Sequence, residues 1–253
     1  MSIKVEAVPN MPHIEKGDNI GEIIVQSAIK AEFEIADGDI LCVASKVVST
    51  AEGRDIRLDD IEVSDLANQI HEQIPRKDPR VIQKIIDETG DPTGSRLDID
   101  KNFVAGWLPN GMRLTSSGID KIDPEHVMLL PKNPDTSARK IGEIILDILG
   151  VKAGVIITDS DGRVEKAGST QIAIGLYGVP ALRKSESTNP LTGEKKISEE
   201  TFCDLLAATA ALIMSQRGTN KPVVKISGVG YEFDENSRIV DSLSRVPEDY
   251  VNE

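Results

Sequence analysis

The chain has 253 residues, of which 39% are hydrophobic, 28% are charged and only 3% are aromatic. This is the composition of a soluble globular protein whose core is packed mainly by aliphatic side chains. The formal net charge of −13 disfavours a nucleic-acid-binding protein, which normally carries a basic face, so no nucleic-acid partner is expected. A phosphate-rich ligand would need local cations or metal ions to enter so acidic a molecule.

In the first half of the chain, apolar residues either alternate as in strands or recur at helical spacing. Residues 39–49 are predicted as a strand, because Leu41, Val43, Val47 and Val48 suit burial in a sheet. The other expected elements are a strand at 3–8, a helix at 17–31 capped by Asp18, helices at 64–74 and 78–89, the second with Pro79 in its first turn, and a loop at 89–96.

The second half also interleaves strands and helices. We expect a hairpin at 103–115, a strand at 127–130, a helix at 134–149 capped by Asp135 or Thr136, a strand at 153–163 that ends in a turn, a strand at 170–179, a polar loop at 185–196, a helix at 198–216 capped by Ser198 and a strand at 222–230. The fold class is therefore α/β (α+β), with mixed, largely antiparallel sheets and packed helices. The whole chain is taken as one unit, and two interleaved subdomains are the alternative.

The helix at 198–216 has an apolar stripe at i, i+3, i+4 and i+7 spacing. We expect this stripe to be buried and the helix to be covered on more than one face, by its own sheet and by a partner subunit. A plain core helix is an equally good interpretation. The stripe consists of Phe202, Leu205, Leu206, Thr209, Leu212 and Ile213.

The N-terminal segment MSIKVEAVPNMPHIEKGD lacks the apolar core of a signal peptide, and LLAATAALIM is too short to span a bilayer. The two cysteines, Cys42 and Cys203, lack the spacing of a zinc site and are expected to be reduced thiols. These features predict a cytoplasmic protein with no membrane partner.

Polar side chains interrupt and follow the apolar run LCVASKVVSTAEGR at residues 41–54. The hydroxyls of Ser45 and Thr50 and the cations of Lys46 and Arg54 could hold a phosphate-bearing ligand. For these residues alone, an exposed edge with a charged turn is the better interpretation.

Two clusters of carboxylates could bind a metal ion. In GVIITDSDGR, Thr158, Asp159, Ser160 and Asp161 follow a buried run, and hard oxygen ligands suit magnesium or manganese. A turn at Asp161 and Gly162 is the alternative.

The segment SSGIDKID supplies the second cluster, Asp120 and Asp123, for which a helix cap or a turn is the alternative. Spacing does not show whether the two clusters meet. The sequence has no P-loop and no G-x-S-x-G elbow, and its three histidines form no helical zinc pair.

A larger pattern is formed by DGDILCVASKVVSTAEGR, SSGID, LLPKNPDTSARKI, GVIITDSDGR and AIGLYGV, together with VEAVPNMPHIEKGD and LIMSQRG. In order and spacing these segments resemble the coenzyme F-420-0:γ-glutamyl ligase family over nearly the whole chain. The resemblance implies that family's own mixed α/β fold, a homodimer, and a GTP-dependent ligase that adds L-glutamate to a deazaflavin precursor through an acyl phosphate. It also implies two divalent metal ions, magnesium or manganese, and a monovalent cation such as potassium.

Carried over position by position, the resemblance implies catalytic roles for Lys46, Asp120 and Asp159. Asp120 and Asp159 would bind one metal ion, and Ser160 and Gln216 would help to hold a second. The implied nucleotide-binding residues are Met11, Pro12, His13, Ile14, Ser45, Lys46, Thr50, Asp123, Met214, Ser215, Gln216, Arg217, Gly218, Thr219, Asn220 and Lys221.

The chain departs from the family pattern at several positions to which the resemblance assigns contacts with substrates. Thr50 stands where lysine is usual, Asp123 where asparagine is usual, and Glu194 where arginine is usual. Residues 165–167 lack the usual aromatic residue and Arg-Gly, and the usual Asp-Glu pair has become Asp204-Leu205. Two alternatives therefore remain: an amide ligase for another carboxylate acceptor, and a non-catalytic nucleotide-binding dimeric homologue.

Overall fold

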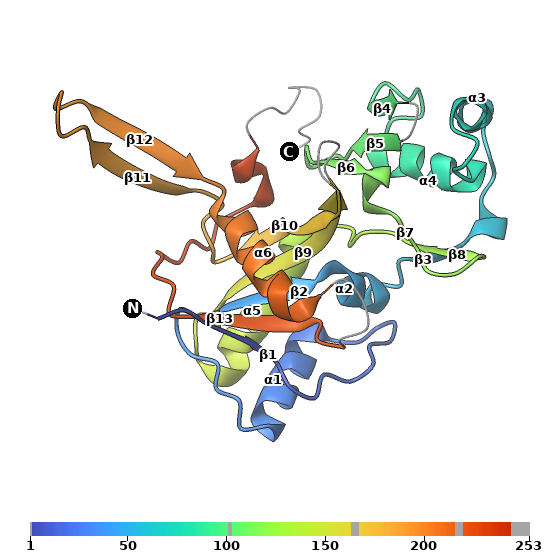
Figure 1. Cartoon of the computed structure of the whole chain (residues 1–253). Coiled ribbons are helices and arrows are strands. Elements are labelled where there is room, and N and C mark those ends of the chain that lie inside the picture. The colour runs from blue at the N-terminus through green and yellow to red at the C-terminus, as the bar shows by residue number, and fades with distance from the viewer. Residues whose placement is uncertain (1, 101–102, 163–166, 216–219, 244–253) are drawn as a thin grey trace.

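The computed structural model describes residues 2–100, 103–162, 167–215 and 220–243 (Figure 1). At its centre is a five-stranded sheet in the order β1-β13-β2-β9-β10, in which the β2–β9 pair is parallel and the other three neighbouring pairs are antiparallel. The prediction of a mixed, largely antiparallel α+β fold is confirmed. The strands are β1 (Lys4–Ala7), β2 (Ile40–Ala44), β9 (Gly154–Gly162), β10 (Ser169–Tyr177) and β13 (Val223–Ser227).

Helices cover both faces of this sheet. Helix α6 (Phe202–Met214) packs on one face, and α1 (Ile20–Lys30) and α5 (Pro134–Leu149) pack together on the other (Figure 1). The largest fully buried side chains of the protein are isoleucine and leucine, as the composition predicts. Burial of each of them stabilises the fold by roughly 1.5–3 kcal/mol. Among the described residues, no helix is both long enough and apolar enough to cross a membrane.

A second lobe lies between α2 (Ser45–Ala51) and α5 in the chain and has its own aliphatic core. Leu58, Ile70, Ile82 and Ile85 are among its fully buried residues. The elements of the lobe are β3 (Asp55–Arg57), α3 (Asp65–Gln73), α4 (Pro79–Thr89), β4 (Leu97–Asp100), β5 (Phe103–Trp107), β6 (Arg113–Thr115), β7 (Asp120–Lys121) and β8 (His126–Met128), with 3-10 turns at Leu58–Asp60 and Ser116–Gly118. The strands form two small sheets, β3-β8-β7 and β4-β5-β6.

The helices with strong local signals form where the sequence predicts them. Helix α4 begins after Asp78, whose side chain accepts a hydrogen bond from the Arg80 N–H, and it ends at Gly90 with a left-handed φ of 69°. Helix α5 has the predicted bounds, but Asn133 caps it instead of Asp135 or Thr136. Asn19, instead of Asp18, caps α1. In both cases the capping residue lies one to three positions from the predicted one.

The strand predicted at residues 39–49 is wrong in its second half. Strand β2 ends at Ala44, and Ser45–Ala51 form α2. The buried side chains of this segment, Ser45, Val48 and Ser49, follow i, i+3, i+4 spacing, which a helix places on one face and a strand does not. The two adjacent valines favoured the strand interpretation because they are good strand formers.

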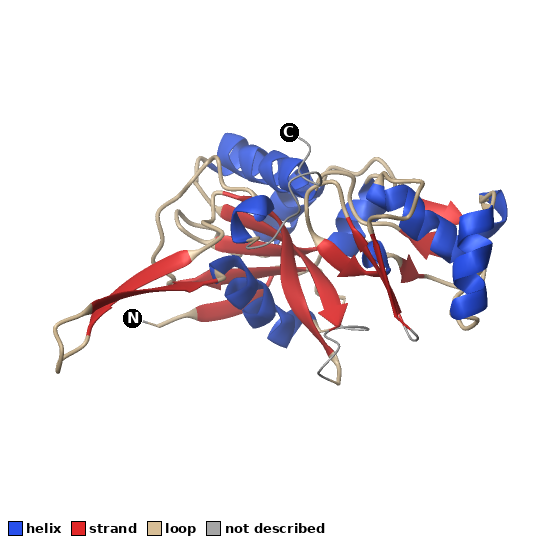
Figure 2. Cartoon of the chain, turned by 90° about the horizontal axis from the view of Figure 1, so that it is seen from above, coloured by secondary structure: helices blue, strands red, loops and turns tan. Residues whose placement is uncertain are grey.

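The polar loop predicted at residues 185–196 is also wrong. Its two ends form a hairpin of β11 (Arg183–Thr188) and β12 (Lys195–Glu200) that projects away from the central sheet (Figure 1 and Figure 2). Cross-strand ion pairs such as Lys184–Glu199 at 3.1 Å and Lys195–Glu186 at 2.6 Å align the strands. Every residue of both strands is exposed, so the sequence lacks the apolar alternation that identifies a strand.

Two predictions for the last helix need correction. Because Ser198 lies in β12, α6 begins at Phe202, and Thr201 takes the capping position. Leu205 and Leu212 of the predicted stripe are 47% and 85% exposed. The face that is buried consists of Phe202, Cys203, Leu206, Ala207, Ala210 and Met214. Of the three leucines in the predicted stripe, only Leu206 lies on the buried face, where it is accompanied by the small side chains of Ala207 and Ala210.

The turn predicted at Asp161 and Gly162 is a continuation of β9. Asp161 pairs with Thr170 and Gly162 with Ser169 in the antiparallel ladder of β9 and β10. Cys42 and Cys203 are both buried and free. The remaining expectations, the strands near 3–8, 127–130, 170–179 and 222–230, the helix at 64–74 and the hairpin at 103–115, are confirmed within a few residues.

Gly175 provides a test of the packing between β10 and α5. A Cβ atom there would lie 2.4 Å from the Pro134 carbonyl carbon and 2.6 Å from its oxygen, and backbone atoms cannot move aside cheaply. We expect Gly175→Ala to lower the free energy of unfolding by about 1–3 kcal/mol in urea denaturation. Gly230→Ala, where nothing lies within 4 Å of the added atom, is the control and should change it by less than about 0.5 kcal/mol. Equal effects of the two substitutions would contradict the packing.

Candidate functional site

The ends of several strands meet at one edge of the central sheet. Because β2 and β9 are parallel, their carboxyl ends lie side by side, with Ala44 opposite Thr158. The antiparallel neighbours bring the end of β1 and the start of β13 to the same edge, where the Val8 N–H bonds to the Val223 oxygen and the Ala44 N–H bonds to the Pro222 oxygen. Side chains from segments far apart in the sequence therefore gather at this edge, as ligand-binding residues do in other parallel-strand folds.

The residues that follow Ala44 and Thr158 are Ser45 and Asp159, and they contact each other. The Ser45 Oγ donates a hydrogen bond of 2.7 Å to Asp159 Oδ1. Ser45 is buried in the first turn of α2, so this hydroxyl is held in place. The bond fixes the position of one carboxylate oxygen of Asp159.

Asp120 reaches the same place from the second lobe. It begins β7, and its Oδ2 lies 3.1 Å from Lys46 Nζ of α2, in an ion pair of which both side chains are more than half exposed. Asp120 and Asp159 line one narrow cavity of about 10 Å³, which has room for little more than an ion or a water molecule. The other lining residues are Ser45, Lys46, Ser49, Gly118, Met128, Leu129 and Leu130. The fold thus brings together one carboxylate from each of the two clusters that sequence spacing left separate.

The electrostatics of the cavity favour a cation. Burial, together with the negative charge of Asp120, raises the pKa of Asp159 to about 7, although the Ser45 hydrogen bond and the Lys46 charge act in the opposite direction. Asp159 therefore has ionised and neutral forms of similar population near neutral pH. A cation placed between the two carboxylates would favour the ionised form and remove their repulsion.

The donor set fits a magnesium or manganese ion that takes part of its coordination from water or phosphate. The available atoms are carboxylate and hydroxyl oxygens, the hard ligands that these ions prefer. The Lys46 ammonium against Asp120 shows that the site attracts positive charge. Among the described residues, no group of three or more histidine, cysteine, aspartate or glutamate side chains could hold a metal ion alone.

Of the predicted nucleotide-binding residues, Ser45 and Lys46 line this cavity. Lys46 and Thr50 lie one turn apart on α2, with the Thr50 hydroxyl donating to the Lys46 carbonyl oxygen. Residues 11–14 follow β1; Met11 and Ile14 are buried, whereas Pro12 and His13 are exposed. Met214 ends α6 and is buried beside Thr158, Ser215 follows it, and Asn220 and Lys221 precede β13. Gln216, Arg217, Gly218 and Thr219 lie outside the described residues.

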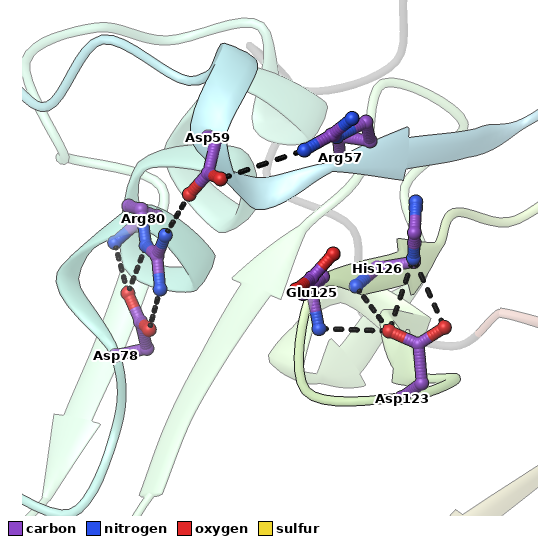
Figure 3. A network of polar contacts seen from close by, with 7 residues as sticks. All are labelled: Arg57, Asp59, Asp78, Arg80, Asp123, Glu125 and His126. Carbon is purple, nitrogen blue, oxygen red and sulfur yellow. Dashed lines mark hydrogen bonds and ion pairs between the residues drawn. The ribbon is translucent and has the colours of Figure 1, made fainter.

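Two predicted residues have other surroundings. Asp123 closes the turn between β7 and β8, where its carboxylate accepts hydrogen bonds from the Glu125 and His126 backbone N–H groups and contacts the His126 ring (Figure 3). Ser160 pairs with Gln171 of β10, and alternation along β9 directs it to the opposite face from Asp159. These two residues therefore do not line the cavity that Asp120 and Asp159 share.

Sequence reasoning missed Ser49. It is buried, lines the cavity and lies one turn after Ser45 in α2. The signal that would have found it is the i, i+4 spacing of the two serines, which becomes meaningful once the segment is read as a helix. The buried Gln171, whose Oε1 has no partner within the described residues, was missed as well.

Comparison with known proteins agrees with the family resemblance that the sequence motifs carry. The model of the family described as F420-0:Gamma-glutamyl ligase matches residues 9–228. The chain is 36% identical over 251 residues to the coenzyme F420:L-glutamate ligase of Methanopyrus kandleri, an alignment that covers 97% of this chain and 96% of the relative. It is 36% identical over 232 residues to the Methanocaldococcus jannaschii protein of the same name, with coverages of 91% and 90%.

A third relative of that name, from Methanosarcina acetivorans, is 34% identical over 238 residues, with coverages of 93% and 89%. Similarity of this extent includes both lobes and the edge where their side chains meet. This chain belongs to the F420-0:gamma-glutamyl ligase family.

Proposed function

We propose that the chain is a GTP-dependent and metal-dependent ligase that joins L-glutamate to the deazaflavin precursor coenzyme F-420-0 through an acyl phosphate. The observation that carries the proposal is the convergence of Asp120, Asp159 and Lys46 on one cavity, in a chain whose relatives are named for this ligation. Family membership supports the amide-forming reaction, and the charges of the cavity support the use of a metal ion and of a phosphate donor.

The chemistry explains why such a site is needed. A carboxylate is a poor electrophile, so its oxygen first attacks the γ-phosphorus of GTP, and GDP leaves. The glutamate amine then attacks the acyl carbon of the mixed anhydride, and the amide forms as inorganic phosphate and a proton are released. Phosphoryl transfer demands positive charge near the phosphate oxygens, because negative charge is spread over them in the transition state.

The residues of the cavity have distinct roles in this proposal. Asp120 and Asp159 would hold one divalent ion, and that ion would supply positive charge to neutralise the phosphates. Lys46 is exposed and its ion pair with Asp120 is weak, so its ammonium is available to a phosphate oxygen. The nucleotide would lie over the cavity beside Lys46 and Thr50, since the cavity itself has no room for it.

The second metal ion implied by the family resemblance, with Ser160 and Gln216 as ligands, and the monovalent cation remain part of the proposal. So does the homodimer. Exposed apolar side chains support an interface at the projecting hairpin, since Ile197 of β12 is 66% exposed and Leu191, in the turn between β11 and β12, is 93% exposed.

The direct test incubates the purified protein with coenzyme F-420-0, L-glutamate, GTP and Mn²⁺ and detects the glutamylated product by mass spectrometry. Asp120→Asn should lower kcat by about 100-fold or more, because it removes a negative ligand while keeping the shape of the side chain. Asp87→Asn, on the surface of α4, is the control.

If the protein ligates glutamate only to a different carboxylate acceptor, the proposed substrate is wrong. GTP binding without turnover of any acceptor would show a non-catalytic homologue.

The raised pKa of Asp159 predicts a pH-dependent effect on the stability of the metal-free protein. Between the ordinary pKa of 3.8 and about 7 the native state keeps a proton that the unfolded chain has lost, so the wild-type protein loses stability as pH rises through this range. Asp159→Asn should therefore raise the free energy of unfolding at pH 8 by at most about 4 kcal/mol, and by little at pH 4. Urea denaturation at several pH values measures this difference.

Asp91 supplies the control of opposite sign. Hydrogen bonds from Ser95 and Thr93 hold the pKa of Asp91 below its ordinary value, so Asp91→Asn should lower stability at neutral pH. A pH-independent effect of Asp159→Asn would refute the electrostatic description of the cavity.

Lys46 should contribute to nucleotide binding. We expect Lys46→Met to weaken GTP binding about tenfold and to reduce its salt dependence, because one screened attraction to phosphate is lost. Lys46→Met combined with Thr50→Lys should regain part of the affinity, since residue 50 lies one turn along the same helix. Titration calorimetry at low and high salt measures both effects. Lys30→Met, at the C-terminal end of α1, is the control. If Lys30→Met and Lys46→Met bind GTP with equal affinity, Lys46 does not contact the nucleotide.

A further inference from the structure

The segment before Asp120 has an unusual backbone. Ser116, Ser117 and Gly118 have φ values of 54°, 51° and 71°, so three consecutive residues are left-handed. Glycine adopts this conformation freely, but serine does so only at a cost in free energy. Two such serines in succession persist only where their surroundings hold them, and strain of this kind concentrates at functional sites.

Several contacts hold this turn from different sides. The Ser117 side chain is buried and its Oγ donates a 3.3 Å hydrogen bond to the Ile85 oxygen of α4. Gly106 of β5 makes room for it, because a Cβ atom there would lie 2.2 Å from Ser117 Oγ. Gly118 lies against Leu130, where a Cβ atom would lie 2.4 Å from a methyl carbon. The turn is therefore enclosed by α4, by β5 and by the segment after β8.

The remaining contact comes from Lys77, in the connection between α3 and α4. Its Nζ donates a 2.7 Å hydrogen bond to Ser116 Oγ. Its own backbone is fixed at both ends, since its N–H donates to the Ile74 oxygen and its carbonyl oxygen lies 2.8 Å from His71 Nδ1. Burial and the nearby Arg76 charge lower the pKa of Lys77. These contacts fix the position of the Lys77 amino group, which is partly desolvated, unlike that of an ordinary surface lysine.

The turn leads directly to the candidate site. The Ile119 N–H closes it by donating to the Ser116 oxygen at 2.9 Å, and the next residue, Asp120 of β7, pairs with Met128 of β8. Gly118 itself lines the cavity with Asp120 and Asp159. Loss of the hydrogen bond between Lys77 and Ser116 would allow the backbone of the turn to leave the left-handed region. The Asp120 carboxylate would then turn away from the cavity.

We propose that Lys77 is a positioning residue, whose ammonium clamps the left-handed turn Ser116–Gly118 and thereby aims Asp120 at the cavity. Its effect on ligation rests on the proposed function, whereas its effect on the turn does not. Lys77 acts only through Ser116 and Asp120.

Amide hydrogen exchange at Ile119, resolved by NMR, tests the clamp without any need for activity. Lys77→Met keeps the aliphatic stem but removes the charged donor, and a hydrogen bond from a charged group protects an adjacent turn by a factor of about ten or more. We therefore expect the Ile119 amide to exchange at least about tenfold faster. Lys84→Met is the matched control, because Lys84 is a half-buried lysine of the same lobe that pairs with Asp87, and it should leave this amide unchanged.

A second variant separates the clamp from a general loss of stability. Glycine adopts a positive φ without cost, so in a Ser116→Gly background the turn no longer needs Lys77. Adding Lys77→Met to Ser116→Gly should then change Ile119 exchange less than about twofold. If Lys77→Met does not fold, Lys77→Gln, whose neutral amide is a weaker donor, replaces it.

Ligation kinetics supply the functional readout. Lys77→Met should lower kcat about tenfold while the KM for GTP stays within about twofold, since Asp120 is misdirected and Lys46 is untouched. Unchanged Ile119 exchange in Lys77→Met, or faster exchange with an unchanged kcat, would overturn the inference. If the wild-type protein ligates nothing, the proposed function fails, and the exchange data alone decide whether Lys77 clamps the turn.

Discussion

The parallel pairing of β2 with β9 is the constraint on which the site depends. It sets Ala44 opposite Thr158, so that Ser45 and Asp159 emerge together and form their 2.7 Å hydrogen bond. In an antiparallel pair the ends of the two strands would point in opposite directions. The same pairing directs α2 across the edge of the sheet, and α2 carries Lys46 toward the second lobe. The second lobe then needs to supply only one further group, Asp120.

Local signals predicted the elements that local interactions form. Helix α5 could be placed from its apolar stripe and helix α4 from Asp78 and Pro79, because capping and amphipathic burial act within a few residues. The hairpin of β11 and β12 could not be found in this way. Its strands are stabilised by ion pairs between residues such as Lys184 and Glu199, and such pairs become visible only when the register is known.

The site was predictable in kind but not in arrangement. As aspartates, Asp120 and Asp159 suggested ligands for a hard metal ion. They belong to different sheets and to different lobes, however, and no rule of sequence spacing joins them. Ser49 was missed because residues 45–49 were predicted as part of a strand, and Lys77 was missed because no motif contains it. Both residues act through contacts made by the tertiary structure. Only the family resemblance predicted that Asp120 and Asp159 lie at one site.

The cavity concentrates features that destabilise the fold when considered alone. Each left-handed serine before Asp120 costs about 1–2 kcal/mol, and the raised pKa of Asp159 reflects a carboxylate held where ionisation is unfavourable. These costs are comparable with a large part of the net stability of a typical domain, about 5–15 kcal/mol. Two separate aliphatic cores offset them, one beneath the central sheet and one in the second lobe. Because each core fixes one of the two carboxylates, their approach is set by the fold, and a cation bound between them would relieve the repulsion that the fold imposes.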